Sequence, residues 1–321
     1  MIEIFDRIKE DLNDVKIIIN NLLLDKHESV QKTYNYLSST QGKMLRPALV
    51  IISAMLCDKT LYQKNKNIIH KIAASIELLH IASLVHDDVI DNAIMRRGKE
   101  TINHLYGNKH AVIIGDIIIS ESFKILCSVG NSQIVINVIN TASLLSEGEI
   151  IQEDSAGNVL LDINEYTNII RKKTSSLFES AMILPFLLFD KKDQNINKAG
   201  FIFGIIFQMV DDNLDYNAKI KTTGKNEYSD FFESKITLPI ILLMQNANET
   251  DRLEIIKIFA NKIKSQQDLS VILNMLIKYG ITEKCNQYIA GCVCDLKKIV
   301  STFDNNEILM EIIDFIALRD F

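Results

Sequence analysis

The sequence contains few of the residues that interrupt helices. Its 321 residues include 12 glycines and 3 prolines, whereas average proteins contain about 7% glycine and 5% proline. Tight turns that need these residues are therefore rare, and long uninterrupted elements are favoured. With 47% hydrophobic residues, the chain can also build a sizeable core. This composition favours an all-helical fold.

Cysteine is scarce as well. The chain has five cysteines, an odd number, and no histidine pair follows the closely spaced Cys292 and Cys294. This pattern indicates neither a disulfide framework nor a zinc site. We expect free thiols in a reducing compartment. The cysteines are Cys57, Cys127, Cys285, Cys292 and Cys294.

A basic surplus and a long apolar run are both missing. The formal net charge is −6, which argues against a general nucleic-acid-binding protein. We find no run of about 18 apolar residues, so we expect no transmembrane segment. The opening residues, MIEIFDRIKEDLNDV, are charged every few positions, which is typical of neither a signal peptide nor a transit peptide. We therefore expect a cytoplasmic protein.

No linker rich in proline, glycine or serine divides the chain, so we predict one domain covering residues 1–321. Apolar residues recur at helical spacing, as at Ile72, Ile76 and Leu79. Residues 112–119 could form a strand in isolation, but they lie inside a longer helical pattern. We predict an all-α bundle of roughly a dozen helices around a central cavity. The breaks lie at residues 38–42, 98–101, 107–110, 155–162, 190–194 and 221–234.

Two apolar segments carry the acidic pattern DDxxD. In a helix, the first and last aspartates of this pattern share one face, where like charges repel. A divalent cation offsets that repulsion, and oxygen-only donors suit Mg²⁺, which also binds water and substrate phosphates. One such motif could equally be a helix cap or a solvated face, but two in apolar helices favour a magnesium–diphosphate site. The predicted ligands are Asp87, Asp88, Asp91, Asp211, Asp212 and Asp215.

Basic residues accompany the acidic motifs. Lys43 and Arg46 lie three positions apart at a predicted helix start, where the helix dipole favours an anion. Arginine binds phosphate oxygens in a bidentate way. A single basic pair is often only a solvated charge, but the whole set favours phosphate binding. The other basic residues of the set are Arg96, Arg97, Lys172, Lys173, Lys225 and Lys235.

Taken in order, these motifs resemble those of the trans-isoprenyl diphosphate synthases, the polyprenyl synthetase family. The matching stretches are GKMLRP, LLHIASLVHDDVIDNAIMRRGKET, KKT, FQMVDDNLD and SKITLP, within residues 42–239. Two DDxxD motifs, the first followed by RRG, form a highly specific combination. The resemblance implies an isoprenoid-synthase helical bundle, a homodimer, and a cluster of about three Mg²⁺ ions.

The resemblance also implies roles for individual residues. The residues that would grip isopentenyl diphosphate are Lys43, Arg46, His80 and Arg97. Those that would grip the allylic diphosphate are Arg96, Lys173, Lys225 and Lys235. The implied catalytic residues are Lys173, Thr174, Gln208 and Arg96. The dipoles of Thr174 and Gln208 would stabilise a carbocation. A lone helical histidine such as His80 is otherwise more often structural.

The implied reaction is the head-to-tail (1′-4) condensation of isopentenyl diphosphate onto an allylic diphosphate primer. The allylic C–O bond ionises, diphosphate leaves, and the double bond of isopentenyl diphosphate attacks the allylic cation. A proton then passes to the departing diphosphate. Catalysis would rest on positioning and electrostatic stabilisation in a cavity without water. Membrane contact would be transient and limited to product release.

Small residues before the first acidic motif predict a long product. Ala82 and Ser83 precede Asp87 by about one helical turn and would face the cavity. The resemblance implies that aromatic residues at these positions would form a floor of the cavity and stop the growth of the prenyl chain early. We predict a product of roughly C35–C50, best matched by octaprenyl, for ubiquinone or menaquinone side chains. The candidates for a deeper floor are Ser75, Leu79 and Phe123.

Three alternatives stay open at this point. The first is a shorter-chain farnesyl or geranylgeranyl diphosphate synthase. The second is a non-catalytic regulatory subunit of a heterodimeric synthase, which would be expected to lose an acidic motif. The third is a terpene cyclase or head-to-head synthase, which would lack the GKxLRP and RRG sites. Product analysis separates the first alternative from a long-chain synthase.

The sequence departs from the family pattern at two places. Glu100 and Thr101 stand where the family usually has Pro-Thr. In the loop after the second acidic motif, Tyr228 and Ser234 replace glycines, and Asn226 replaces a proline. The basic residues of this loop are kept, but the resemblance leaves its conformation open.

Overall fold

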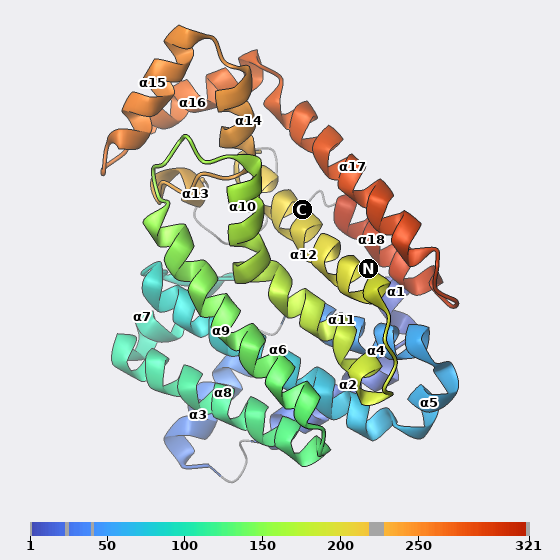
Figure 1. Ribbon diagram of the computed structural model, residues 1–321. Coiled ribbons are helices and arrows are strands. Elements are labelled where there is room, and N and C mark those ends of the chain that lie inside the picture. The colour runs from blue at the N-terminus through green and yellow to red at the C-terminus, as the bar shows by residue number, and fades with distance from the viewer. Residues whose placement is uncertain (1, 23–25, 40–41, 218–227, 319–321) are drawn as a thin grey trace.

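The computed structural model describes residues 2–22, 26–39, 42–217 and 228–318 (Figure 1). In these residues the chain forms α-helices α1 to α18, a π-helical turn η1 and one two-stranded hairpin. The predicted all-α fold is confirmed. The helices outnumber the predicted dozen chiefly because α1, α5, α7 and α13 have only 4 to 6 residues. Helices this short show no periodic pattern in the sequence.

The first half of the chain contains α1 (Ile2–Asp6), α2 (Lys9–Asn21), α3 (Glu28–Ser38), α4 (Leu45–Cys57), α5 (Lys59–Lys64), α6 (Lys66–Ile90), α7 (Ile102–Tyr106), α8 (Asn108–Val129) and α9 (Ser132–Asp154). The second half contains α10 (Ile163–Ile170), η1 (Arg171–Ser175), α11 (Ser176–Leu188), α12 (Gln194–Asp215), α13 (Ser229–Phe232), α14 (Leu238–Asn246), α15 (Glu249–Ala260), α16 (Gln266–Lys278), α17 (Ile281–Val300) and α18 (Glu307–Ala317). Between α6 and α7 lie the strands β1 (Met95–Arg96) and β2 (Lys99–Glu100).

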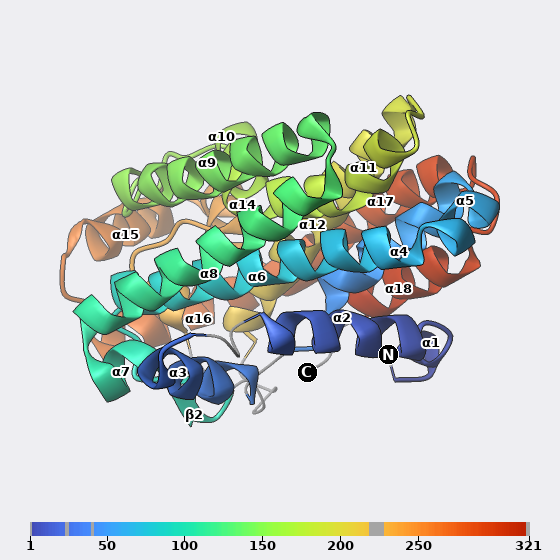
Figure 2. The ribbon, with the colours of Figure 1, turned by 90° about the horizontal axis from the view of Figure 1, so that it is seen from below.

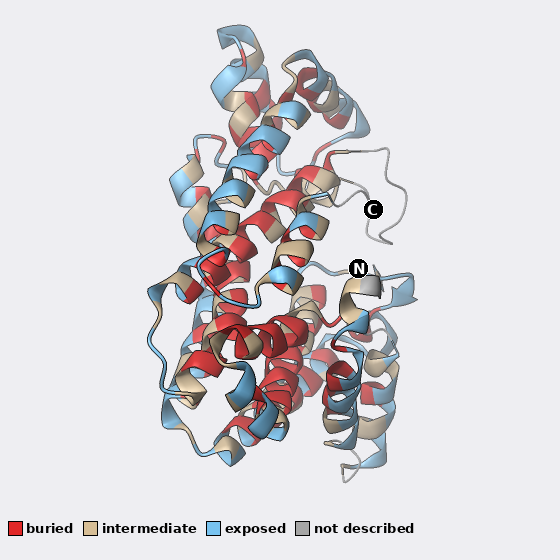
Figure 3. Cartoon of the chain, turned by 90° about the vertical axis from the view of Figure 1, so that its right-hand side faces the viewer, coloured by how far each residue is buried: buried red, intermediate tan, exposed pale blue. Residues whose placement is uncertain are grey.

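The centre of the bundle is built by α4, α6, α11 and α12. α6 packs against α4 and α8, whereas α11 packs against α4, α9 and α12. Figure 2 shows α6, α8 and α9 side by side along the length of the bundle. Most residues of α4 and α11 are buried, and Figure 3 shows the buried residues in red along the inner helices of the bundle. Helices that are apolar on nearly every side are expected in the core of a large bundle.

The π-helical turn η1 joins α10 to α11 and lies between α9 and α12. Two glycines make room for it. A Cβ atom at Gly148 would lie 2.3 Å from the backbone nitrogen of Lys173, and one at Gly204 would lie 2.5 Å from the Cα of Ser175. Both distances are far below van der Waals contact, so a side chain at either position would displace the turn. Such turns occur frequently at functional sites, and this one carries Lys173 and Thr174.

The segment after α6 folds back as a hairpin that presents two arginines. Met95 of β1 pairs with Glu100 of β2 in antiparallel register. The two turn residues, Arg97 and Gly98, have φ values of +52° and +74°, as a type I′ turn requires. Thr101 then caps α7 with its side chain. Glu100 and Thr101, which stand where the family usually has Pro-Thr, therefore lie at the end of β2 and at the N-cap of α7.

Two helices, α6 and α9, are long and apolar enough to cross a membrane by length and composition alone. The most apolar window of α6 is 67% buried inside the protein, as in the core helix of a water-soluble protein, whereas that of α9 is only 22% buried. This is weak evidence for a membrane span, and the absence of one stays a prediction. The exposed apolar side chains of α9 include Ile136, Ile139, Leu144 and Ile150.

Candidate active site

Both acidic motifs lie at the C-terminal ends of long helices. Asp91 is the C-cap residue of α6, and α12 ends at Asp215. The helix dipole places a partial negative charge at a C-terminus, so a carboxylate there is destabilised. Each motif therefore adds negative charge where its helix is already negative. This arrangement favours a bound cation.

The surroundings of Asp87 are crowded with further negative charge. Burial raises the pKa of Asp87 to about 6, Lys173 lowers it, and the carboxylates of Glu149 and Asp91 raise it. A half-buried carboxylate with two acidic neighbours is stabilised by a nearby positive charge. This requirement agrees with the predicted role of Asp87 as a metal ligand.

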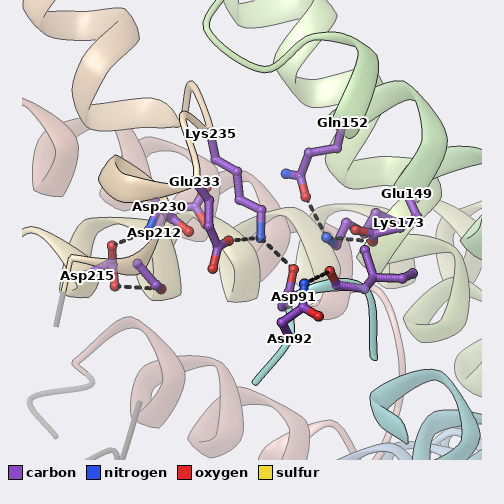
Figure 4. A network of polar contacts seen from close by, with 12 residues as sticks. Asp91, Asn92, Glu149, Gln152, Lys173, Asp212, Asp215, Asp230, Glu233 and Lys235 are labelled. Atoms are coloured by element: carbon purple, nitrogen blue, oxygen red, sulfur yellow. Dashed lines mark hydrogen bonds and ion pairs between the residues drawn. The ribbon is translucent and has the colours of Figure 1, made fainter. Parts of the chain in front are cut away.

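Two lysines from distant parts of the chain lie near the first acidic motif, and one of them contacts it (Figure 4). The Nζ of Lys173, in η1, lies 2.6 Å from the Glu149 carboxylate. The Nζ of Lys235, which follows α13, lies 3.5 Å from Asp91 Oδ1 and also contacts Glu233. Although burial lowers the pKa of Lys235, Asp91 and Glu233 raise it above its ordinary value. The lysine after the second motif thus stands at the first motif.

The central aspartate of each motif is turned into the protein. Asp88 is only 6% exposed and accepts a hydrogen bond of 2.7 Å from Arg96 Nε. Asp212 is only 4% exposed and accepts bonds of 2.6 Å from Tyr166 Oη and 2.7 Å from Gln208 Nε2. The outer aspartates are less buried than these two, so they are better placed to bind a metal. These are Asp87, Asp91, Asp211 and Asp215.

The last aspartate of the second motif also organises the loop that follows. Asp215 accepts hydrogen bonds of 3.0 Å from the backbone N–H of Asp230 and 3.3 Å from the hydroxyl of Ser229. Among the described residues, no three Asp, Glu, His or Cys side chains are close enough to hold a metal ion by themselves. A metal here would therefore take many of its ligands from water and substrate, as Mg²⁺ commonly does.

A chain of hydrogen bonds runs from the predicted carbocation-stabilising residues to the second motif. The hydroxyl of Thr174 donates to Gln208 Oε1 at 2.8 Å, and the amide of Gln208 donates to Asp212. Burial raises the pKa of Asp212 to about 7, the bonds from Tyr166 and Gln208 lower it, and the neighbouring aspartates raise it. Sequence reasoning missed Tyr166, because it lies 46 positions from Asp212 and no local motif marks it.

Three of the residues predicted to grip isopentenyl diphosphate gather beside α6. Arg46 Nη1 lies 3.0 Å from His80 Nε2, and the guanidinium lies 4.3 Å from the ring centroid of Phe178. Burial, followed by Arg46 and Arg97, holds the pKa of His80 well below its ordinary value. His80 is therefore a neutral imidazole whose Nε2 can accept from Arg46. A cavity of about 40 Å³ lies here, and its lining includes Gly42, Glu77, His80, Arg96 and Arg97.

Arg97 and Gly42 both line this cavity and lie close to each other. A Cβ atom at Gly42 would lie 2.7 Å from the Arg97 guanidinium, so a larger residue here would require the end of the Arg97 side chain to move. Lys43 is not among the lining residues, and its Nζ lies 5.6 Å from the ring centroid of Phe315.

Glu77 is a buried acid that sequence reasoning missed. It lies one helical turn before His80 on α6 and is only 4% exposed. Its Oε2 is buried without a hydrogen-bond partner. Burial raises the pKa of Glu77, although Arg46 and Arg97 lower it. Its spacing of three residues from His80 was the one available signal, since residues at this spacing share a helix face.

The residues predicted to set product length lie on α6 and α8. Ser75 Oγ is 2.8 Å from the Oγ of Ser122 on α8, so this stripe of α6 faces α8. Leu79 and Ala82, 2% and 0% exposed, lie on the same stripe. Ser83 is half-buried, and it lies four residues before Asp87 and so on the face of that carboxylate. Phe123 of α8 is partly buried and packs against the core.

The structure describes only part of the loop after the second acidic motif. Lys225 and Asn226 lie outside the described residues. Tyr228 and Ser234, which replace glycines, have φ values of +60° and +62°. The backbone therefore keeps, at both positions, the left-handed conformation that glycine favours.

Comparison with known proteins agrees with this geometry. The family described as "Polyprenyl synthetase" matches residues 27–276. The chain is also 31% identical over 287 residues to the all-trans-nonaprenyl-diphosphate synthase (geranyl-diphosphate specific) of Rhodobacter capsulatus. This match covers 89% of this chain and 86% of that one. The chain belongs to the polyprenyl synthetase family. As a polyprenyl synthetase, it is a trans-prenyl diphosphate synthase that uses isopentenyl diphosphate and an allylic diphosphate.

Two further polyprenyl synthetases extend the comparison. The octaprenyl diphosphate synthase of Escherichia coli K12 is 32% identical over 240 residues, 74% of this chain and 73% of that one. A solved structure of polyprenyl synthase from Caulobacter crescentus CB15, complexed with calcium and isoprenyl diphosphate, has a TM-score of 0.90 at 25% identity. The match covers 99% of this chain and 97% of that one.

Proposed function

We propose that this prenyl diphosphate synthase builds an all-trans polyprenyl diphosphate of roughly C35–C50, with octaprenyl as the best match, for quinone side chains. The observation that carries an active diphosphate site is the contact of Lys235 with Asp91. It brings a cation from the loop after the second motif to the carboxylates of the first. A diphosphate lying between them would be held by lysines and, through metal ions, by aspartates.

The donor set fits Mg²⁺. The ligands would be the outer aspartates, because they lie at negatively charged helix ends and are less buried than the central aspartates. About three Mg²⁺ ions bound there would supply Lewis-acid polarisation of the allylic diphosphate. The calcium in the Caulobacter structure supports a divalent cation in this family. The residues that would hold Mg²⁺ are Asp87, Asp91, Asp211 and Asp215.

Other side chains of the site would bind the allylic diphosphate and stabilise the allylic cation. Lys173 and Lys235 would balance the charge that develops on the leaving diphosphate. Arg96, fixed by Asp88, would assist them. Gln208 is oriented by Asp212, so its amide carbonyl and the Thr174 hydroxyl would present partial negative charge to the allylic cation. Lys225 would belong to the same allylic site.

The residues gathered around His80 would hold the second substrate. Arg46 and Arg97 would bind the diphosphate of isopentenyl diphosphate and keep its double bond toward the allylic carbon. Lys43 would reach this diphosphate from the start of α4. The neutral imidazole of His80 would orient the Arg46 guanidinium through their 3.0 Å contact. The proton lost after attack would pass to the departing diphosphate.

The proposed product length is based on the small side chain of Ala82 and on the products of the named relatives. A small side chain there leaves space along α6, with Leu79, Ser75 and Phe123 as candidates for the floor. The two named relatives make octaprenyl and nonaprenyl diphosphates, which supports a long chain. The alternative is a shorter-chain farnesyl or geranylgeranyl diphosphate synthase. A non-catalytic regulatory subunit is disfavoured, because both acidic motifs are intact.

We also propose a cytoplasmic homodimer that covers the exposed apolar face of α9. Ile136, Ile139 and Ile150 are 57%, 47% and 60% exposed, and a second copy would bury such a face. The membrane would be contacted only when the product is released. The single-domain organisation over residues 1–321 stays a prediction.

One incubation tests the reaction and the product length. The protein is mixed with Mg²⁺, farnesyl diphosphate and radiolabelled isopentenyl diphosphate, and the products are sized by chromatography after dephosphorylation. We expect a ladder that ends near C40 and disappears with excess EDTA. A product that stops at about C20 would favour the shorter-chain alternative, and no elongation would favour the regulatory subunit. An Asp87→Ala variant with near wild-type turnover would exclude the metal assignment.

A further inference from the structure

The short helix α13 ends in a hydrogen-bond pattern that positions Lys235. The backbone N–H of Ser234 donates to the carbonyl of Phe231 at 3.1 Å, and that of Lys235 donates to the carbonyl of Asp230 at 2.8 Å. These two bonds together form a Schellman motif. The motif requires a left-handed backbone at the residue after the C-cap, and Ser234 occupies that place with φ +62°.

Serine is an uncommon residue for this place. Glycine is the usual one, because any Cβ atom clashes with the backbone in the left-handed region. The bonds of the motif alone must therefore work against this strain. Two further contacts hold Ser234 in place. Its carbonyl accepts from the backbone N–H of Gly157 at 2.8 Å, and its hydroxyl accepts from the ammonium of Lys264.

Among the described residues, Lys264 is the one lysine that is buried. It lies between α15 and α16 and is only 8% exposed. Its Nζ lies 5.7 Å from the ring centroid of Phe231 and 5.3 Å from that of Phe259. Lysine is almost never buried without a partner, because removing its charge from water is costly. The ring faces offset part of this cost, and the Ser234 hydroxyl is the side-chain partner.

We propose that Lys264 is a positioning residue for Lys235: its ammonium holds the Ser234 hydroxyl and so maintains the strained turn that directs Lys235 to Asp91. The inference rests on the proposed role of Lys235 in binding the allylic diphosphate. Without the Lys264 bond, Ser234 relaxes out of the left-handed region. The backbone bond from Lys235 to Asp230 is then lost, and Lys235 leaves the first acidic motif.

The two substrates respond differently to this loss. The turn supports only the allylic side of the site, whereas the isopentenyl side is built on α4, α6 and the hairpin. We therefore expect Lys264→Met, which keeps an apolar chain of similar length, to raise the KM for farnesyl diphosphate about tenfold. The KM for isopentenyl diphosphate should stay unchanged. Lys262→Met, at an exposed position two residues away, is the matched control and should change neither value.

Position 234 gives the sharper test. Ser234→Ala removes the hydroxyl but keeps the Cβ atom, so it should raise the farnesyl diphosphate KM as Lys264→Met does. Ser234→Gly removes the strain itself and should behave like wild type. In the double variant Ser234→Gly with Lys264→Met, the KM should return toward the wild-type value, because glycine needs no help to adopt the turn.

Melting curves and circular dichroism of every variant show whether it is folded. If Lys264→Met does not fold, the contrast between Ser234→Ala and Ser234→Gly decides the question alone. The proposal is overturned if alanine and glycine at position 234 give the same KM, or if Lys264→Met raises both substrate KM values equally. A wild-type protein that fails to elongate farnesyl diphosphate would instead contradict the proposed function, so the two failures are distinct.

Discussion

The ammonium of Lys235 lies 3.5 Å from the carboxylate of Asp91, although the two residues are 144 positions apart in the chain. Lys235 follows the second acidic motif, and Asp91 closes the first. This contact places a positive charge beside a carboxylate at the C-terminus of α6, where the helix dipole is unfavourable to negative charge. The same ammonium can bind a diphosphate that enters the site together with divalent cations.

Lys235→Met should therefore impair the allylic side of the site. The substitution keeps the aliphatic stem and removes the charge. We expect kcat/KM for farnesyl diphosphate to fall about 100-fold, because a charge-assisted contact to the leaving group is lost. Steady-state kinetics with each substrate varied in turn measure this. Lys198→Met, on the exposed face of α12, should differ little from wild type, and equal activity of both variants would remove Lys235 from the site.

Tyr166→Phe should weaken both activity and stability. The variant removes only the hydroxyl that donates to Asp212 at 2.6 Å. The buried carboxylate then keeps the bond from Gln208 but loses the one from Tyr166, which costs about 1–3 kcal/mol of unfolding free energy, and Asp212 holds Gln208 less firmly. We expect kcat to fall about tenfold with little change in either KM. Urea unfolding and turnover measurements check this, with the exposed Tyr106→Phe as control. An unchanged kcat would show that the hydrogen-bond chain does not support catalysis.

Gly204→Ala should disturb the π-helical turn. The new methyl group would lie 2.5 Å from the Cα of Ser175, and crowding of this kind costs about 1–3 kcal/mol. We expect a lower melting temperature and a loss of activity, since Lys173 and Thr174 move with the turn. Gly291→Ala, in α17 with nothing within 4 Å of the new atom, is the matched control. It should stabilise the protein slightly, because alanine favours helix over glycine.

The stability of the protein should fall as the pH drops below the ordinary pKa of histidine, partly because of His80. The pKa of His80 is held well below that value by burial and by Arg46 and Arg97. As the pH falls through about 6.5, the unfolded chain binds a proton that the folded chain does not, which costs at most about 1.4 kcal/mol per pH unit. His80→Gln should make the unfolding free energy less dependent on pH in this range. Equal pH profiles for wild type and His80→Gln would contradict the assignment.

Ala82→Phe should shorten the product. Ala82 is completely buried on the stripe of α6 that faces α8, so an aromatic ring there would fill space along the growing chain. Overpacking should also cost about 1–3 kcal/mol, and activity must therefore be compared at a temperature where both proteins are folded. Product sizing measures the chain length. Ser83→Phe is the informative comparison, since it places the ring on the face of Asp87. Unchanged length in both variants would place the floor elsewhere.

Local patterns in the sequence were sufficient for much of the site. Few helix breakers and a 3.6-residue periodicity predicted the helices, because both depend on neighbouring residues only. The DDxxD spacing in apolar segments marked the two acidic helix ends for the same reason. The family resemblance carried by these motifs is confirmed, whereas the ligand roles of the aspartates stay a prediction.

Packing between distant segments decided the rest. No local pattern shows that Asp88 and Asp212 turn inward, because their donors Arg96 and Tyr166 are brought to them by the hairpin and by α10. The pairing of Lys264 with Ser234 is equally invisible in the sequence, since α13 and the segment before α16 meet only in the folded chain. Helix formation is governed by local backbone preferences, but the partner of a buried polar group is chosen by tertiary contacts, and only the folded structure determines those.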